Sequence, residues 1–217
     1  MTHHHPADDL LLGLAAGTLT SGVAVLTASH VETCAHCRDR LLVLETAGGT
    51  LLENLTPESL SSDALARTMA AIDAPQRPLA AKKTEGRLPQ APEGMQWPRA
   101  LSDCVATPWR WIGPGMRWSR VTLPSDPAAK LFLLRIAAGR KLAMHTHAGM
   151  ELTQVLYGRF HDGRDHFAAG DFDETDDSVH HQPEALASGE CICLAYVGGK
   201  VVFKGMLART LGAIMGM

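Results

Sequence analysis

The stretch from Gly139 to Gly158 constrains the fold of this chain more than any other part of the sequence. Its glycines, histidines and glutamate follow the spacing G-x5-H-x-H-x3-E-x6-G. Alternate residues of a strand face the same side, so His145 and His147 point the same way, and Glu151 shares their parity if no bulge intervenes. Imidazole and carboxylate groups bind divalent metals such as Zn²⁺, Fe²⁺, Mn²⁺ or Ni²⁺. The spacing therefore predicts a metal site inside a closed antiparallel sheet.

This stretch resembles the first sequence motif of the cupin family at every named position. The second cupin motif is partly retained, with Gly170 and His181 in register, although its proline, second glycine and asparagine are replaced. The resemblance covers about residues 100 to 205. It implies His181 as the fourth ligand beside His145, His147 and Glu151, and the motif register favours it over the neighbouring His180. Zinc or another divalent metal is the expected cofactor.

The rest of the C-terminal half has the pattern of short strands. Segments rich in branched and aromatic residues are separated by Gly, Pro or Asp turns. These segments are residues 109–112, 117–123, 130–136, 152–160, 191–197 and 200–203. An antiparallel β-barrel or sandwich is predicted.

The N-terminal third has a helical pattern instead. Apolar residues recur three or four positions apart between Leu10 and Ile72, with helix starts near Thr20 and Thr56, so three or four short helices are predicted. Residues 73–98 contain five prolines among polar and small residues, which is typical of a linker. We predict an α+β multidomain chain: a helical zinc-binding bundle (1–75), a linker (76–98) and a cupin domain (99–217).

A second candidate metal site lies in the helical part. His30, Cys34 and Cys37 stand at positions i, i+4 and i+7, which places them on one side of a regular helix. Thiolates and imidazole favour a tetrahedral structural zinc site, which needs a fourth ligand from elsewhere. His5 is our candidate, although its neighbours His3 and His4 remain open.

The cysteines of this chain also allow interpretations other than zinc binding. Cys34-x-x-Cys37 also occurs in thioredoxin-like redox proteins, but these carry it in a βαβ unit that is not visible here. A pair of buried core cysteines is a further alternative. Cys191 and Cys193 would share one face of a strand, where they could approach the barrel metal, respond to oxidants or simply pack in the core.

The charge distribution limits the partners of the helical part. Residues 1–75 carry nine acidic side chains and only three basic ones, although the whole chain has a net charge of −3. Such a region should repel nucleic acid and could attract a basic protein. The sequence shows neither a signal peptide nor an apolar run long enough to cross a bilayer, so we expect a cytoplasmic protein with no membrane partner.

The His-x3-Cys-x2-Cys spacing in a small acidic helical module resembles the zinc-binding anti-sigma domain. Followed by a cupin, it resembles the ChrR family of anti-sigma factors over nearly the whole chain. This resemblance implies a structural zinc on His5, His30, Cys34 and Cys37. It also implies that the helical module sequesters a group-IV (extracytoplasmic-function) sigma factor, and that the cupin triggers release in response to singlet oxygen or organic peroxide.

We therefore predict a regulator and no enzyme. A metal-dependent cupin dioxygenase is the alternative, because an open coordination position on a barrel metal could activate a substrate. A DNA-binding regulator is a second alternative, but the acidic balance of the helical part argues against direct contact with nucleic acid.

Overall fold

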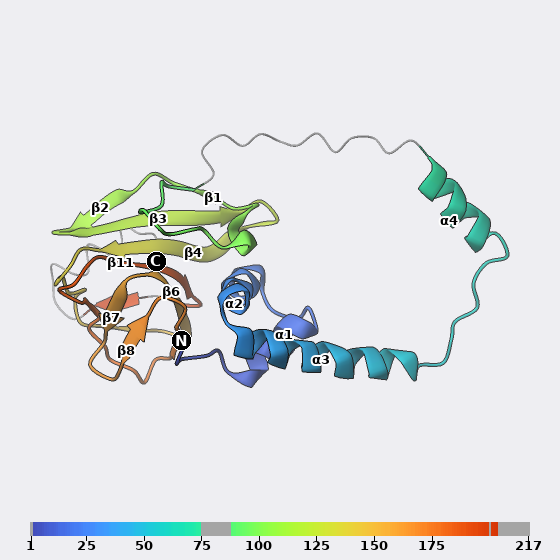
Figure 1. The fold of residues 1–217 in the computed structure, drawn as a ribbon, viewed down its shortest axis with the longest axis horizontal. Helices are drawn as coiled ribbons and strands as arrows, with labels where there is room; N and C mark the ends of the chain where they lie inside the picture. Colours follow the sequence, from blue (N-terminus) through green and yellow to red (C-terminus); the bar gives the residue numbers. More distant parts are fainter. Residues whose placement is uncertain (1, 75–87, 200, 204–217) are drawn as a thin grey trace.

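The computed structural model describes residues 2–74, 88–199 and 201–203. In this part of the chain, helices come first and strands follow (Figure 1). The helices are α1 (Asp8–Ala15), α2 (Ser21–Thr33), α3 (Ala35–Glu53), α4 (Ala64–Asp73) and the short 3-10 helix η1 (Arg99–Leu101). The structure confirms the predicted α+β organisation.

The strands form antiparallel sheets that enclose an interior. They are β1 (Val105–Ala106), β2 (Arg110–Gly113), β3 (Met116–Leu123), β4 (Asp126–Ile136), β5 (His145–His147), β6 (Glu151–Tyr157), β7 (Arg159–His161), β8 (His166–Ala168), β9 (Phe172–Thr175), β10 (Glu184–Ala185), β11 (Cys191–Val197) and β12 (Val201–Phe203). The largest sheet has the order β1-β3-β4-β11-β6-β9, with β2 on β3. Two smaller sheets, β10-β7-β8 and β12-β5, complete the arrangement.

The predicted strand at residues 152–160 is in fact two strands, β6 and β7, which meet at Gly158. Gly158 has a φ of +74°, and a Cβ atom there would lie 1.9 Å from the carbonyl oxygen of Glu190. Only glycine fits this turn, because a side chain would add both backbone strain and a clash.

Gly158→Ala is expected to lower the free energy of unfolding by about 3 kcal/mol, since strain and overpacking act together. Gly163→Ala is the matched control: its φ is +91°, but no atom lies within 4 Å of the added Cβ. It should cost only about 1 kcal/mol of strain. Urea unfolding of both variants measures the difference, and equal losses would contradict the close packing against Glu190.

The helix starts were predicted with mixed success. α2 begins at Ser21, as expected, but no helix begins near Thr56. The segment before α4 is exposed, with Leu60 at 83% exposure, so no packing stabilises a helical turn there. The chain turns at Ser61 instead, whose carbonyl accepts the amide N–H of Ala64 at the start of α4.

Residues 76–87 of the linker predicted for residues 76–98 lie outside the described residues, which resume at Leu88. From there to Trp97 the chain has no regular secondary structure, but Leu88 and Trp97 pack against the largest hydrophobic core. The indole N–H of Trp97 donates to the carbonyl of Pro89 at 3.0 Å. The domain bounds at 75 and 98 remain a prediction.

Helix α2 lies against the outer face of the large sheet and joins the two halves of the chain (Figure 1). Val23 and Leu26 of α2 belong to the same buried core as Leu133, Leu152 and Leu194 of the sheet. Burying each such side chain contributes roughly 1.5–3 kcal/mol. The helical part therefore shares its main core with the strands.

Two polar contacts strengthen this junction. The Ser29 hydroxyl donates to the Gln154 side-chain oxygen, and both residues are buried. The Glu32 carboxylate accepts the backbone N–H groups of Arg99 and Ala100 at 2.8 and 2.6 Å, which caps the start of η1. Within the described residues, no helix has the length and apolar character needed to span a bilayer.

Candidate metal centres

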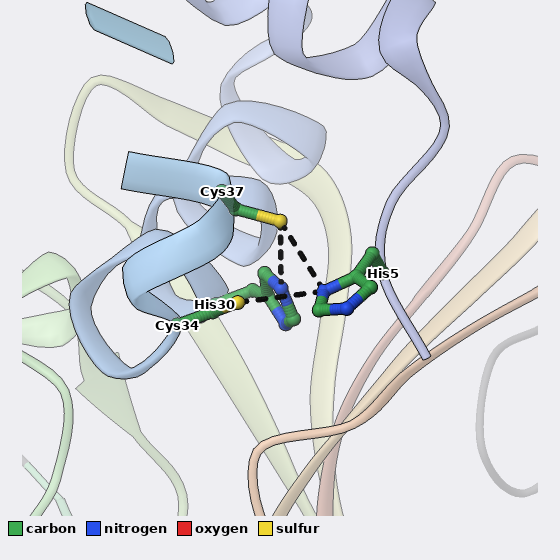
Figure 2. A group of neighbouring side chains, drawn as sticks. All are labelled: His5, His30, Cys34 and Cys37. Carbon is green, nitrogen blue, oxygen red and sulfur yellow. Dashed lines mark hydrogen bonds between the residues drawn. The ribbon is translucent and has the colours of Figure 1, made fainter. Parts of the chain in front are cut away.

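The structure brings His5, His30, Cys34 and Cys37 together into one cluster (Figure 2). The four ligand atoms lie within 4.8 Å of one another. Nε2 of His30 is 3.3 Å from Sγ of Cys37, and Nδ1 of His5 is 3.4 Å from Sγ of Cys34 and 3.5 Å from Sγ of Cys37. Two sulfurs and two imidazole nitrogens at this spacing are the donor set of a structural zinc site.

The spacing had predicted that His30, Cys34 and Cys37 lie on one face of a single helix. The structure differs from this prediction. α2 ends at Thr33, Cys34 is extended with φ −105° and ψ 110°, and α3 begins at Ala35. His30 therefore comes from one helix and Cys37 from the next, with Cys34 at the bend between them. The i, i+4, i+7 spacing selected residues that the structure brings together, but their arrangement depends on a helix junction.

Of the adjacent histidines, His5 is the one that joins the cluster. It lies on the extended segment before α1, facing the two cysteines (Figure 2). His4 points elsewhere, with its ring 4.5 Å from that of Phe167. His36 lies near the His5 ring but outside the cluster. That these four residues bind zinc remains a prediction.

Burial disfavours the charged forms of His30 and Cys37. It lowers the pKa of His30 to about 4, with the nearby His5 as a further cause. Burial and the neighbouring Cys34 raise the pKa of the Cys37 thiol to about 12. A divalent cation reverses this preference, because it stabilises thiolates that the site alone disfavours. The donor set and its burial thus fit a zinc ion.

The second cluster lies inside the sheets and contains His145, His147, Glu151 and His181, all buried. Nε2 of His181 is 3.0 Å from Nε2 of His145 and 3.4 Å from Nε2 of His147. An oxygen of Glu151 is 2.7 Å from Nε2 of His147 and 3.4 Å from Nε2 of His181. Four ligand atoms converge on one point, as the cupin spacing predicted.

These residues come from three places in the fold. His145 and His147 are on β5, whereas Glu151 begins β6 after a turn, so strand parity alone does not place it. His181 joins them through an isolated bridge to His145. The neighbouring His180 is exposed and stays outside, in agreement with the motif register.

The electrostatics of this second cluster fit a divalent cation. Burial opposes ionisation of Glu151, but His147 and His181 hold the pKa of its carboxyl well below the usual range. Burial lowers the pKa of His145 to about 4. Its Nδ1 is 2.8 Å from the carbonyl of Ala143, which leaves Nε2 directed at the cluster.

Sequence reasoning missed a supporting layer around His181. Asp162 has an oxygen 3.7 Å from Nδ1 of His181, and Arg164 bridges Asp162 and Asp173 with distances of 2.6 to 3.0 Å. Although burial opposes it, Asp162 and Glu151 raise the pKa of His181 to about 9. No sequence motif predicts these residues, because their contacts join a turn to β9 and to His181 only in the folded chain.

A cavity of about 40 Å³ adjoins this cluster. Phe132, Leu134 and Ile136 line it on the apolar side, and Cys193 also contributes. Sγ of Cys193 lies 3.7 Å from Sγ of Cys191, and both cysteines are buried and reduced. The close pairing of these thiols and their burial raise the pKa of Cys193.

Strand β9 touches both clusters. Its first residue, Phe172, places its ring 5.5 Å from that of His30 in an edge-on contact. Asp173 binds Arg164 beside the barrel cluster, and the Thr175 hydroxyl donates to Glu151 at 3.3 Å. A short strand thus connects two candidate metal sites that are far apart in sequence.

Antiparallel sheets that enclose a His/Glu cluster define the C-terminal half as a cupin domain. Residues 98–199 match the family model described as a ChrR cupin-like domain. The anti-sigma-E factor ChrR of Cereibacter sphaeroides is 38% identical over 207 residues, which cover 95% of this chain and 94% of that protein. The chain belongs to the ChrR family of anti-sigma factors.

The solved structures agree with this assignment. The chain is similar to one in the crystal structure of Rhodobacter sphaeroides SigE in complex with the anti-sigma ChrR, with a TM-score of 0.73 and 35% sequence identity. The match covers 91% of this chain and 100% of that one. It extends beyond the cupin domain, because 91% of the chain must include most of the helical part.

Proposed function

We propose that the chain is a zinc-dependent anti-sigma factor whose helices α3 and α4 bind a group-IV (extracytoplasmic-function) sigma factor. The observation that carries this proposal is an apolar surface on these helices and the segment between them, which no other described residue covers. Large apolar side chains from Leu42 to Ile72 are 49–83% exposed. They are Leu42, Val43, Leu51, Leu52, Leu55, Leu60, Leu65, Met69 and Ile72. Exposed apolar surface of this extent marks a protein interface.

Helix α4 gives the clearest case for a partner. It has ten residues and buries none of them, and Figure 1 shows it apart from the sheets. Leu65, Met69 and Ile72 lie at positions i, i+4 and i+7, so they form one apolar stripe. An isolated helix of this length is marginal in water, so its stability requires a surface that covers the stripe.

The charge of this region supports a sigma factor as the partner. From Asp39 to Asp73 the chain carries six acidic and two basic side chains. A protein that binds promoter DNA presents basic surfaces, which this region would attract and occupy. The same charge disfavours direct binding of the helical region to nucleic acid. The SigE complex of the solved relative supports this choice of partner.

The two metal clusters would serve different steps. Zinc on His5, His30, Cys34 and Cys37 would hold α2 and α3 in the arrangement that presents the binding surface. The cupin would hold zinc or another divalent metal on His145, His147, Glu151 and His181. We propose that singlet oxygen or organic peroxide alters this site and that β9 carries the change to the helices. Such a protein acts in the cytoplasm, where RNA polymerase works.

The small barrel cavity supports a regulator over the dioxygenase alternative. Its volume is about 40 Å³. Sites for organic substrates are typically about 300–1,000 Å³.

Leu65→Asp tests the binding surface. It is expected to weaken binding of the sigma-factor partner by about 30-fold or more, because it places a charge in the centre of an apolar contact. Titration of the full-length variant against the labelled sigma factor measures this.

Ala70→Asp is the matched control, since it adds the same charge to the same exposed helix about 140° away from Leu65. It should change the affinity less than threefold or so. Equal affinities for wild type and Leu65→Asp would refute α4 as a sigma-binding helix.

A further inference from the structure

The zinc ligand His5 is the only member of the N-terminal cluster that no helix supports. His30 and Cys37 lie on α2 and α3, and Cys34 lies at their junction, all buried. His5 instead belongs to the extended arm of residues 2–7, and it is the most exposed of the four. Its position therefore depends on whatever holds this arm.

The arm is held by the cupin domain. One oxygen of Asp171 accepts the backbone N–H groups of His3 and His4 at 2.7 and 3.2 Å. The carbonyl of His4 in turn accepts the N–H of Phe172 at 3.1 Å, so the arm pairs with the start of β9. These bonds surround the two residues immediately before His5.

A further anchor lies on the other side of His5. The N–H of Ala7 donates to the Glu174 carboxylate at 2.7 Å. Pro6, which stands between His5 and Ala7, is buried, and its ring limits its backbone to one range of φ. His5 is therefore fixed between two attachment points on β9 and its preceding turn.

Asp171 is suited to act as the main anchor. Its side chain is 1% exposed, and its second oxygen accepts the N–H of Ala168 at 2.8 Å. Its own backbone carbonyl accepts the N–H of Val155 on β6 at 3.0 Å. The carboxylate is thus rigidly attached to the barrel, and one of its oxygens accepts hydrogen bonds from the arm. A buried carboxylate accepting amide N–H groups forms strong, charge-assisted hydrogen bonds.

We propose that Asp171 is a positioning residue for the N-terminal zinc: by holding residues 3 and 4, the cupin domain keeps His5 on the metal and slows zinc release. This inference rests on the proposed zinc site of the anti-sigma module. Residues that orient a ligand typically change metal affinity by about 10–100-fold. When the arm is detached, His5 has to find the metal from a disordered segment, which lowers its effective concentration.

The test measures zinc transfer from the full-length, zinc-loaded protein to a chromogenic chelator in excess. Asp171→Ala is expected to release zinc about 10-fold faster than wild type. Deletion of residues 2–4 should accelerate release to a similar extent, because it removes the same anchors without touching the barrel. Asp177→Ala is the control: it removes an equal charge from an exposed turn of the barrel and should leave the rate unchanged.

Each result decides the inference. Wild-type release rates in both Asp171→Ala and the deletion would overturn it. Faster release in the deletion with a normal rate in Asp171→Ala would overturn the role of Asp171. If Asp171→Ala does not fold, the deletion alone decides whether the arm slows zinc release. Sigma-factor binding, measured on the same wild-type sample, separates this result from the proposed function: a chain that binds sigma factor but shows no effect of the arm refutes only the inference.

Discussion

Replacing Cys37 with serine is expected to remove the metal from the N-terminal cluster and leave the barrel metal in place. Cys37 is fully buried, and its sulfur lies within 3.5 Å of ring nitrogens of both His5 and His30. A serine hydroxyl does not supply the soft anionic ligand that zinc requires at this position.

The expected loss is large because zinc binding and folding are coupled. Structural zinc contributes about 10–16 kcal/mol in small modules, so losing one ligand in four should cost on the order of 3 kcal/mol, or more than 100-fold in zinc affinity. Sigma-factor binding should fall with it, since α2 and α3 meet at this cluster. The measurement is metal content per chain after dialysis against a chelator, together with sigma binding.

Cys104→Ser provides the matched control for this prediction. Cys104 is also buried, but it lies in the large core outside both clusters. The new hydroxyl should destabilise the fold by about 1–3 kcal/mol and leave both metals bound. A Cys37→Ser protein that retains a full equivalent of chelator-resistant zinc at this site would show that Cys37 is not a ligand.

His147→Ala is expected to remove the metal from the barrel and to retain the N-terminal zinc. His147 is 1% exposed, and its Nε2 lies 2.7 Å from the Glu151 carboxylate. Without it, the cluster loses a ligand, and the buried carboxylate loses its closest partner, which should cost roughly 3–5 kcal/mol of stability. The variant should still bind the sigma factor, but peroxide or singlet oxygen should no longer release it.

Metal analysis and a sigma-release assay check this second prediction on the same sample. His180→Ala is the control, because this histidine is exposed and stands outside the cluster, next to His181. It should retain both metals and respond normally. If a His147→Ala protein lacks the barrel metal but still releases the sigma factor normally when oxidant is added, the barrel metal does not sense the oxidant.

The residues that converge in the two clusters were partly predictable from the sequence, because each cluster contains a short, distinctive spacing. His145-x-His147 and Cys34-x-x-Cys37 put metal-binding side chains within a few residues, and local backbone geometry keeps them close. Long-range partners were harder to assign. His181 was predicted through the cupin register, and His5 through its place before the first helix.

The details of each cluster required the tertiary structure. A regular helix through Cys34 was expected, but the chain bends there to pack α3 against α1 while α2 covers the sheet. Glu151 was expected to share a strand with His147, yet a turn separates them. In both cases the ligands still converge, because packing of whole elements positions them.

The sequence by itself determined which side chains could bind metal and that a helical module precedes a cupin, since chemistry and periodicity are local properties. Only the tertiary structure decided that His5 completes the first cluster, that Asp171 holds its arm and that Asp162 supports His181. These relations join residues 19 to 168 positions apart. Such contacts arise from the path of the folded chain, which spacing along the sequence does not encode.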